Sequence, residues 1–234
     1  MKQKQSGFTL IEIAIVLVII GLLLGGVLKG QELINSAKVK NLANDFRNIP
    51  VYIYGYQDKF RSLPGDDATV GTATTHIPNG TACTPAATPQ HCVVGNGLID
   101  GPWDSTTVAD ESYVFWQHIR LAGLAAGTTD TTQPFASYLP TNAAGGFIGI
   151  QSNVNFTTIT KKADGSASPM TGSYIICSQG ILGRFAAQLD VTMDDGDSNT
   201  GSMRVADPAN NGQSVTTATL NANPGQAYTV CMGV

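Results

Sequence analysis

The sequence predicts an α+β protein, with a long N-terminal helix, first transmembrane and then amphipathic, packed on a small antiparallel β-sheet head. Apolar residues recur at helical spacing over about the first 60 residues. Short strand-like runs fill the second half, separated by turn clusters such as Asp164-Gly165. With 234 residues the chain is long enough for one sizeable domain and an appended segment.

The composition is typical of a protein exposed outside the cytoplasm. Only 13% of the residues are charged, and 26 are glycines. The formal net charge of −4 argues against a nucleic-acid partner, because no basic cluster could neutralise phosphates. Five of the 13 basic residues lie within the first 40 positions: Lys2, Lys4, Lys29, Lys38 and Lys40.

The N-terminal helix begins with an apolar run long enough to cross a membrane. Residues 8–28 contain one charge, Glu12, and as a helix would reach about 31 Å. Lys2 and Lys4 precede the run, which predicts a cytoplasmic N-terminus and an exported C-terminal body. A cleavable secretory signal would carry its small-residue site after the run, but Gly25-Gly26-Val27-Leu28 offers no such site. A carboxylate in lipid is costly, so Glu12 calls for a partner.

The residues Gly7-Phe8-Thr9-Leu10-Ile11-Glu12, after a basic leader, resemble the signal of type IV prepilins and type II secretion pseudopilins. In that family a membrane-embedded aspartyl peptidase, the prepilin peptidase/N-methyltransferase, cuts after the glycine and methylates the new N-terminal phenylalanine. The resemblance implies that Gly7 is the cleavage residue and Phe8 the mature N-terminus. It also implies that Glu12 neutralises the N-terminal amine of a neighbouring subunit during assembly.

The function implied is that of a structural subunit of a type IV pilus or pseudopilus filament. The expected partners are the peptidase, copies of the chain and other pilins through the N-terminal helix, and the inner-membrane assembly machinery. Before assembly the protein is expected to cross the bacterial inner membrane once, with its head in the periplasm. After assembly it is expected in the filament. A minor pilin acting as tip adhesin or assembly initiator is an alternative, as is an exported enzyme on a signal anchor. No catalytic set stands out, so we expect no enzyme.

The helical pattern continues beyond the membrane run. Its apolar positions follow a 3,4,3,4 spacing on one face, at Val39, Leu42, Phe46, Ile49, Ile53, Tyr56, Phe60 and Leu63. Pro50 should bend this helix, and Pro64-Gly65 should end it. We therefore expect a leader at 1–7, a helix at 8–63 with its span at about 8–28, and an extracytoplasmic head at 64–234.

Within the head, a long connection at 64–108 should lead into a second helix at about 109–123. Strands are expected at 146–151, 154–160, 173–177, 202–205 and 227–230, with a further short helix at 182–188.

The four cysteines suit disulfides in an oxidising compartment, because they are even in number and contain no CxxC. Cys83 and Cys92 bracket a short loop, which favours a local bridge and leaves Cys177 to pair with Cys231. Three connectivities are compatible with four cysteines. A zinc set of His76, Cys83, His91 and Cys92 is the weaker interpretation, since adjacent His91-Cys92 is poor chelate spacing. Cys177 could also be a nucleophile with His118 as its base, but a disulfide is the simpler explanation for this cysteine.

An acidic turn near the C-terminus is the best metal candidate. It comprises Asp190, Asp194, Asp195, Asp197 and Asn199. Alternate oxygens from 195, 197 and 199 resemble the first half of a Ca²⁺ loop, although position 206 holds alanine where an EF-hand has glutamate. Some major pseudopilins hold Ca²⁺ in a C-terminal loop. The candidate ligands are therefore Asp194, Asp195, Asp197 and Asn199, and the alternative is a solvated turn held by Asx bonds.

Overall fold

The computed structural model describes residues 9–72, 76–84, 91–210 and 212–234. It divides into two compact units, Met1–Lys38 and Val39–Val234. The expected fold class is confirmed, because a long N-terminal helix is accompanied by a four-stranded antiparallel sheet.

Helix α1 spans Leu10–Phe60 and continues through Pro50. It ends where Arg61 takes a left-handed backbone with φ 58°, three residues before the Pro64-Gly65 stop predicted from the sequence. From Val39 onward α1 belongs to the second unit. The head was expected to begin at residue 64, after the helix, but it also includes this second part of α1. The buried side chains of that part are six from the predicted stripe and Ala43, which was not predicted; the six are Val39, Leu42, Phe46, Ile49, Ile53 and Tyr56.

The main sheet has the strand order β1-β3-β6-β4, and all its neighbouring strands are antiparallel. Its strands are β1 (Ile148–Ser152), β3 (Tyr174–Leu182), β4 (Met203–Ala206) and β6 (Ala227–Gly233). Strand β3 runs beyond the predicted end at residue 177. Gly180, with φ 76°, accommodates the register shift between Ser178 and Ile181 that this extension requires.

Both faces of the main sheet are covered, so its strands contribute to two cores. On one face Ile150, Ile176 and Val230 join the main core, which also contains the buried stripe of α1. On the other face Ile175, Cys177 and Cys231 pack with Trp103. This alternation follows from the two-residue period of a strand.

The expected strand at 154–160 is only partly correct. Asn153–Asn155 form the 3₁₀ helix η1, and Val154 is 74% exposed. Strand β2 is limited to Ile159–Lys161 and pairs in parallel with the two-residue β5 (Gly212–Gln213) in a separate small sheet. An apolar residue that stays in solvent gives no burial energy to hold a longer strand.

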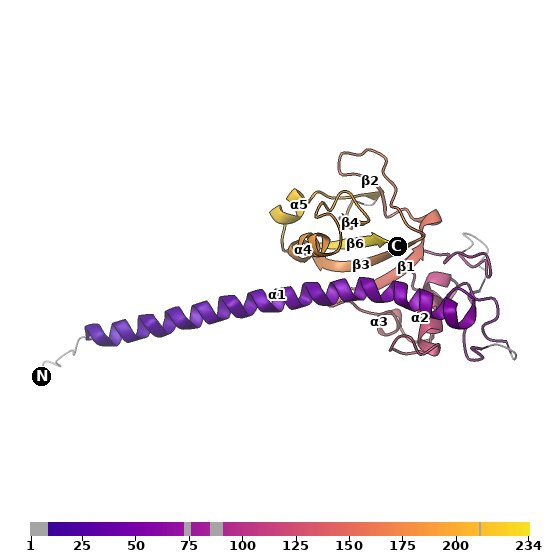
Figure 1. The fold of residues 1–234 in the computed structure, drawn as a ribbon, viewed down its shortest axis with the longest axis horizontal. Helices are drawn as coiled ribbons and strands as arrows, with labels where there is room; N and C mark the ends of the chain where they lie inside the picture. Colours follow the sequence, from indigo (N-terminus) through magenta and orange to yellow (C-terminus); the bar gives the residue numbers. More distant parts are fainter. Residues whose placement is uncertain (1–8, 73–75, 85–90, 211) are drawn as a thin grey trace, which may run out of the picture. The chain divides into compact units, whose positions relative to one another are not determined.

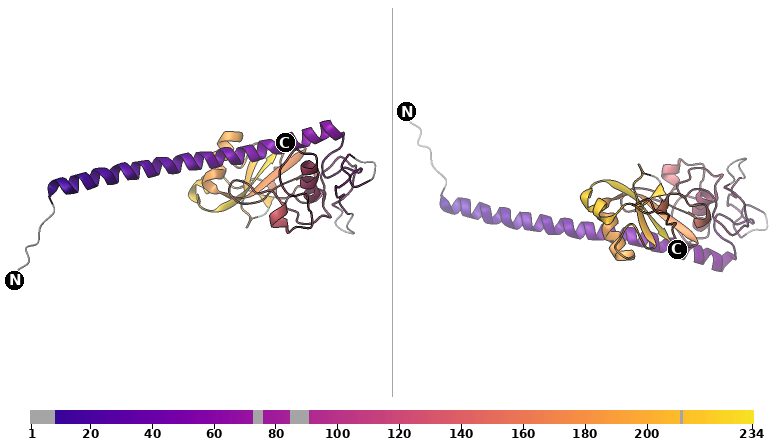
Figure 2. Two further views of the ribbon diagram at one scale, coloured as in Figure 1. Left: turned by 90° about the horizontal axis from the view of Figure 1, so that it is seen from below. Right: turned by 90° about the horizontal axis from the view of Figure 1, so that it is seen from above.

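The described part of the head also contains four shorter α-helices: α2 (Glu111–Leu121), α3 (Phe135–Tyr138), α4 (Gly183–Met193) and α5 (Thr217–Ala222). Helix α4 extends five residues beyond the predicted end at 188. Helix α5 was missed because it is only six residues long and alternates good helix formers with threonine and asparagine; it is capped by the Thr216 side chain. Figures 1 and 2 agree in placing α4 and α5 at one end of the main sheet and α2 at the other.

Candidate functional site

The described chain begins inside the predicted signal. Gly7 and Phe8 lie outside the described residues, whereas Thr9 and Glu12 form the helix start. The Thr9 backbone N–H donates to Glu12 Oε2 at 2.8 Å, and the Thr9 hydroxyl donates to the same oxygen at 2.7 Å. The Glu12 N–H donates back to Thr9 Oγ1 at 3.4 Å, which completes a capping box. Within the monomer, Glu12 therefore caps its own helix.

The apolar run of α1 has no partner within its own unit. Every residue from 9 to 28 is exposed, with Leu10 at 93% and Leu22 at 73%. In the described part of the chain α1 is the one helix long and apolar enough to cross a membrane, with a mean hydropathy of 2.8 in its most apolar window. Exposed apolar surface of this extent requires lipid or neighbouring helices.

The predicted stop after α1 forms a buried polar cluster. Asp67 Oδ2 accepts hydrogen bonds from the Tyr56 hydroxyl at 2.7 Å and from His76 Nε2 at 2.8 Å. The fully buried His118 of α2 accepts from the Gly65 N–H through Nδ1, at 2.9 Å. Its other nitrogen, Nε2, must then carry the proton and donate to the Thr81 carbonyl at 3.0 Å. His118 is therefore held as the neutral imidazole.

This arrangement predicts that His118 makes the head sensitive to acid. Burial lowers the pKa of His118 below its ordinary 6.5. A histidine with a depressed folded-state pKa contributes stability above pH 6.5 and loses it as the pH falls. Thermal melting of the parent and of His118→Gln from pH 7.5 to 5 should show a smaller acid-side loss in the variant, since glutamine does not titrate.

His91→Gln is the matched control, because it makes the same change at a part-exposed histidine outside this polar cluster. Parallel melting profiles for the parent and His118→Gln would contradict the role assigned to His118.

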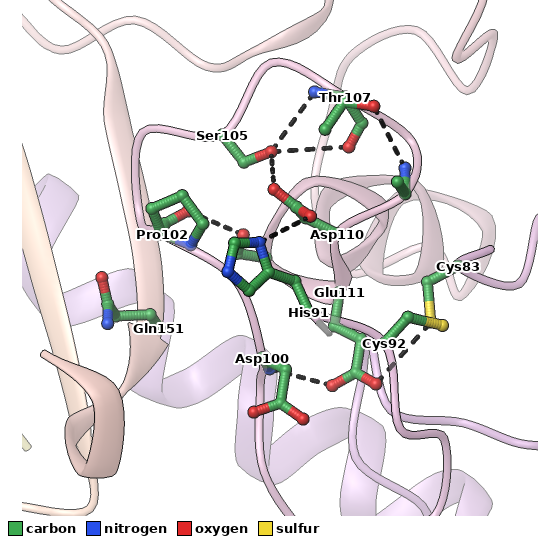
Figure 3. Close-up of polar contacts among 12 residues, drawn as sticks. Cys83, His91, Cys92, Asp100, Pro102, Ser105, Thr107, Asp110, Glu111 and Gln151 are labelled. Atoms are coloured by element: carbon green, nitrogen blue, oxygen red, sulfur yellow. Dashed lines mark hydrogen bonds and ion pairs between the residues drawn. A yellow bond between two sulfur atoms is a disulfide. The ribbon is translucent and has the colours of Figure 1, made fainter. Parts of the chain in front are cut away.

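The zinc interpretation, which was the weaker one from the sequence, does not fit the structure. Cys83 and Cys92 form a disulfide, so neither offers a thiolate. His91 Nδ1 instead lies 3.1 Å from Asp110 Oδ1, and the Ser105 hydroxyl donates to Asp110 Oδ2 at 2.6 Å (Figure 3). The second disulfide joins Cys177 and Cys231, which face each other across β3 and β6 with their Cα atoms 4.0 Å apart. The connectivity is the one favoured from the sequence, and it leaves no nucleophilic thiol at Cys177.

Glu111, at the start of α2, holds two loops beside the first disulfide (Figure 3). It is fully buried, and its carboxylate accepts from the Val93 N–H at 2.8 Å and the Asp100 N–H at 2.9 Å. Burial raises the pKa of Glu111 to about 7. Its hydrogen-bond partners come from segments distant in the sequence, so no local pattern marks this role of Glu111.

The acidic turn begins inside α4 rather than after it. Asp190 is fully buried, and neither of its carboxylate oxygens has a hydrogen-bond partner among the described residues. Carboxylate oxygens of Asp190, Asp194 and Asp195 lie within 4.8 Å of one another. Burial, together with the charges of Asp195, Asp194 and Asp197, raises the pKa of Asp190 to about 7.

The other two expected ligands have different roles. Asn199 Oδ1 accepts from the Ala163 N–H at 2.7 Å and from the Ser214 hydroxyl at 2.5 Å, so it ties the turn to neighbouring loops. Asp197 Oδ1 accepts from the Asn199 N–H at 3.1 Å, which is an Asx turn. The structure therefore groups Asp194 and Asp195 with Asp190, a residue that lies outside the predicted ligand set.

Comparison with known proteins identifies the N-terminal segment. Residues 2–28 match the family model of the prokaryotic N-terminal methylation motif, which is the signal of type IV prepilins and pseudopilins. The matched range contains Gly7, Phe8 and Glu12, and it confirms the resemblance seen in the sequence. No curated protein and no solved structure matches the chain. The motif supports a protein of the type IV pilin or pseudopilin type.

Proposed function

We propose that the protein is a structural subunit of a type IV pilus or pseudopilus filament, held in the bacterial inner membrane by the first part of α1 until assembly. The observation that carries the proposal is the methylation motif at 2–28, which coincides with the exposed apolar start of α1. A signal of this kind implies processing by a prepilin peptidase/N-methyltransferase. The head then faces the periplasm, in keeping with its two disulfides.

The chemistry of α1 supports packing against copies of itself and other pilins. Moving its apolar side chains from lipid to neighbouring helices exchanges one apolar environment for another, so little free energy opposes extraction from the membrane. Glu12 is the exception, because it is the one charge among residues 8–28. Its partner in the filament is the N-terminal amine of Phe8 in a neighbouring subunit, since each group needs an opposite charge away from water.

Processing is expected to occur between Gly7 and Phe8 and to leave an N-methylated phenylalanine. The cut is expected at this junction because the basic leader ends in glycine directly before the apolar run. The intact mass of the protein extracted from membranes measures the cut and the added methyl group together. Gly7→Leu should accumulate as the uncut precursor, with Gly30→Leu as a matched change outside the junction. A mature chain that starts after residue 28 would rule out the proposal.

We also propose that the head binds one Ca²⁺ ion between Asp190, Asp194 and Asp195. The supporting observation is Asp190, whose two buried oxygens have no partner among the described residues yet face two further carboxylates. A buried, unpartnered carboxylate is unfavourable unless it is protonated or paired with a cation. Clustered carboxylate oxygens are the ligands that Ca²⁺ prefers.

A further inference from the structure

Three adjoining hollows surround the turn formed by Trp103 and Asp104, and all three are lined by both residues. Their volumes are about 500, 340 and 140 Å³. We call the combined surface the Trp103 groove. The largest hollow also has His91, Gln151 and Asn155 in its wall, and the smallest has Phe135. The whole groove belongs to the second unit.

The groove presents uncharged hydrogen-bonding groups that the described chain leaves unused. The side chains of Asn155 and Thr157 are exposed, and neither forms a hydrogen bond to a described residue. His91 lines the same hollow and is held by its Nδ1 contact with Asp110, which leaves Nε2 for a ligand. Amides and hydroxyls combine donor and acceptor positions, and the remaining imidazole nitrogen supplies one of the two. Such groups complement ligands that carry several hydroxyls.

The one formal charge among the groove's non-histidine side chains is negative. Asp104 is exposed and, in the part of the chain that the structure describes, has no ion-pair or hydrogen-bond partner for its side chain. No Lys or Arg lines any of the three hollows as described. Phosphate, sulfate and acidic ligands are therefore disfavoured, because a like charge would oppose them without a compensating cation.

The groove is also unsuited to peptide binding by strand addition. Strand β1 is an edge of the main sheet, but the loop before α2 already occupies it. The Ser152 N–H donates to the Ile99 carbonyl at 2.9 Å, and the Trp103 N–H donates to Gln151 Oε1 at 2.9 Å. A peptide could not displace these contacts without leaving buried polar groups unpaired.

Aromatic surface borders the polar wall. Trp103 is 7% exposed, and its indole N–H donates to Thr158 Oγ1 at 3.1 Å, so this ring mainly packs the core. Phe135 is 44% exposed and lies edge-on to Phe147, with ring centroids 5.6 Å apart. An exposed ring next to amides, hydroxyls and one carboxylate matches a sugar, which has an apolar C–H face and a rim of hydroxyls.

We propose that the Trp103 groove binds uncharged sugar residues of a glycan. Asp104 accepts hydrogen bonds from the hydroxyls, Asn155 and Thr157 both accept and donate them, and Phe135 packs against the C–H face. Because sites that pair with hydroxyls reject ligands that lack them, deoxygenated sugars bind more weakly. This activity is additional to filament formation and does not depend on it.

The test uses the full-length protein in an amine-oxide detergent, since sugar-based detergents would compete. Tetrasaccharides of glucose, galactose, mannose and N-acetylglucosamine are the probes, and saturation-transfer NMR measures binding. At least one probe should show saturable binding, which Asp104→Ala and Asn155→Ala each weaken about tenfold, the loss expected for one good hydrogen bond to a charged or planar group.

Asp58→Ala is the matched control, because it removes an exposed carboxylate from α1 outside the groove and should leave binding unchanged. Gln151 is not replaced, since its side chain supports the Trp103 backbone. Melting temperatures of the variants confirm that each is folded. The proposal is overturned if none of the four probes binds saturably, if a sulfated tetrasaccharide or choline binds in their place, or if Asp104→Ala and Asn155→Ala bind as the parent does.

Discussion

Replacing Glu12 by valine is expected to abolish filaments while the protein is still inserted and processed. The substitution removes the one charge among residues 8–28 and leaves the N-terminal amine of the neighbouring subunit without a partner. Removing one member of a buried ion pair costs on the order of 3–5 kcal/mol, so filament yield should fall about a hundredfold or more. The measurement compares protein in the sheared filament fraction with protein in the membrane pool.

Two control variants separate the charge of Glu12 from its role as a helix cap. Thr9→Ala removes the hydroxyl that bonds to Glu12 and keeps the carboxylate, so it should lower filament yield only slightly. Glu32→Val removes an exposed acid that pairs with Lys29 at 2.7 Å, outside the apolar run, and should assemble as the parent does. Normal filament yield from Glu12→Val would refute the intermolecular pairing.

Millimolar Ca²⁺ is expected to raise the melting temperature of the head, and Asp190→Asn should remove that response. An ion at a concentration of 100 times its Kd stabilises the folded state by about 2.7 kcal/mol. For a domain of this size the shift is about 5–10 °C. Without the ion, asparagine should be tolerated at 190, because it relieves a buried carboxylate that has no partner among the described residues. The measurement compares the melting temperatures of the parent and of Asp190→Asn, each with Ca²⁺ and with chelator.

Asp197→Asn is the matched control for Asp190→Asn. It removes one charge from the same turn, retains an oxygen for the Asx bond to the Asn199 N–H, and should keep most of the Ca²⁺ response. If the parent shows no shift, or if Asp190→Asn shifts as the parent does, the acidic turn is a solvated turn and no ion binds at Asp190.

The features that were predictable from the sequence are those carried by local spacing. The prepilin-type signal occupies a few adjacent residues, and the buried stripe of α1 repeats every three or four residues, so both are visible without a fold. Strands β1, β4 and β6 were found within a few residues, because each alternates or is bounded by turn residues. The Cys83–Cys92 bridge follows from the short loop between its cysteines.

The features that were not predictable depend on contacts between distant segments. Glu111 receives its hydrogen bonds from Val93 and Asp100, and the fold alone determines that they meet. Asp190 was counted in the acidic turn but not among its candidate ligands, and only packing shows that it is buried without a partner among the described residues. The same holds for His118, whose neutral tautomer is set by Gly65 and Thr81.

The Cys177–Cys231 bridge has a mechanical consequence. It fastens β3 to β6 at facing positions, and the two cysteines lie 54 residues apart in the chain. When the head is stretched, the segment between the two cysteines cannot extend. The maximum length of the stretched head is therefore roughly 180 Å shorter than it would be without the bridge. A pull applied to either end of the head must therefore pass through the covalent bond between the two strands. Force of this kind can loosen the chain before Cys177, together with its pairing to Met232 and Gly233, but it cannot separate the strand pairs inside the bridged loop.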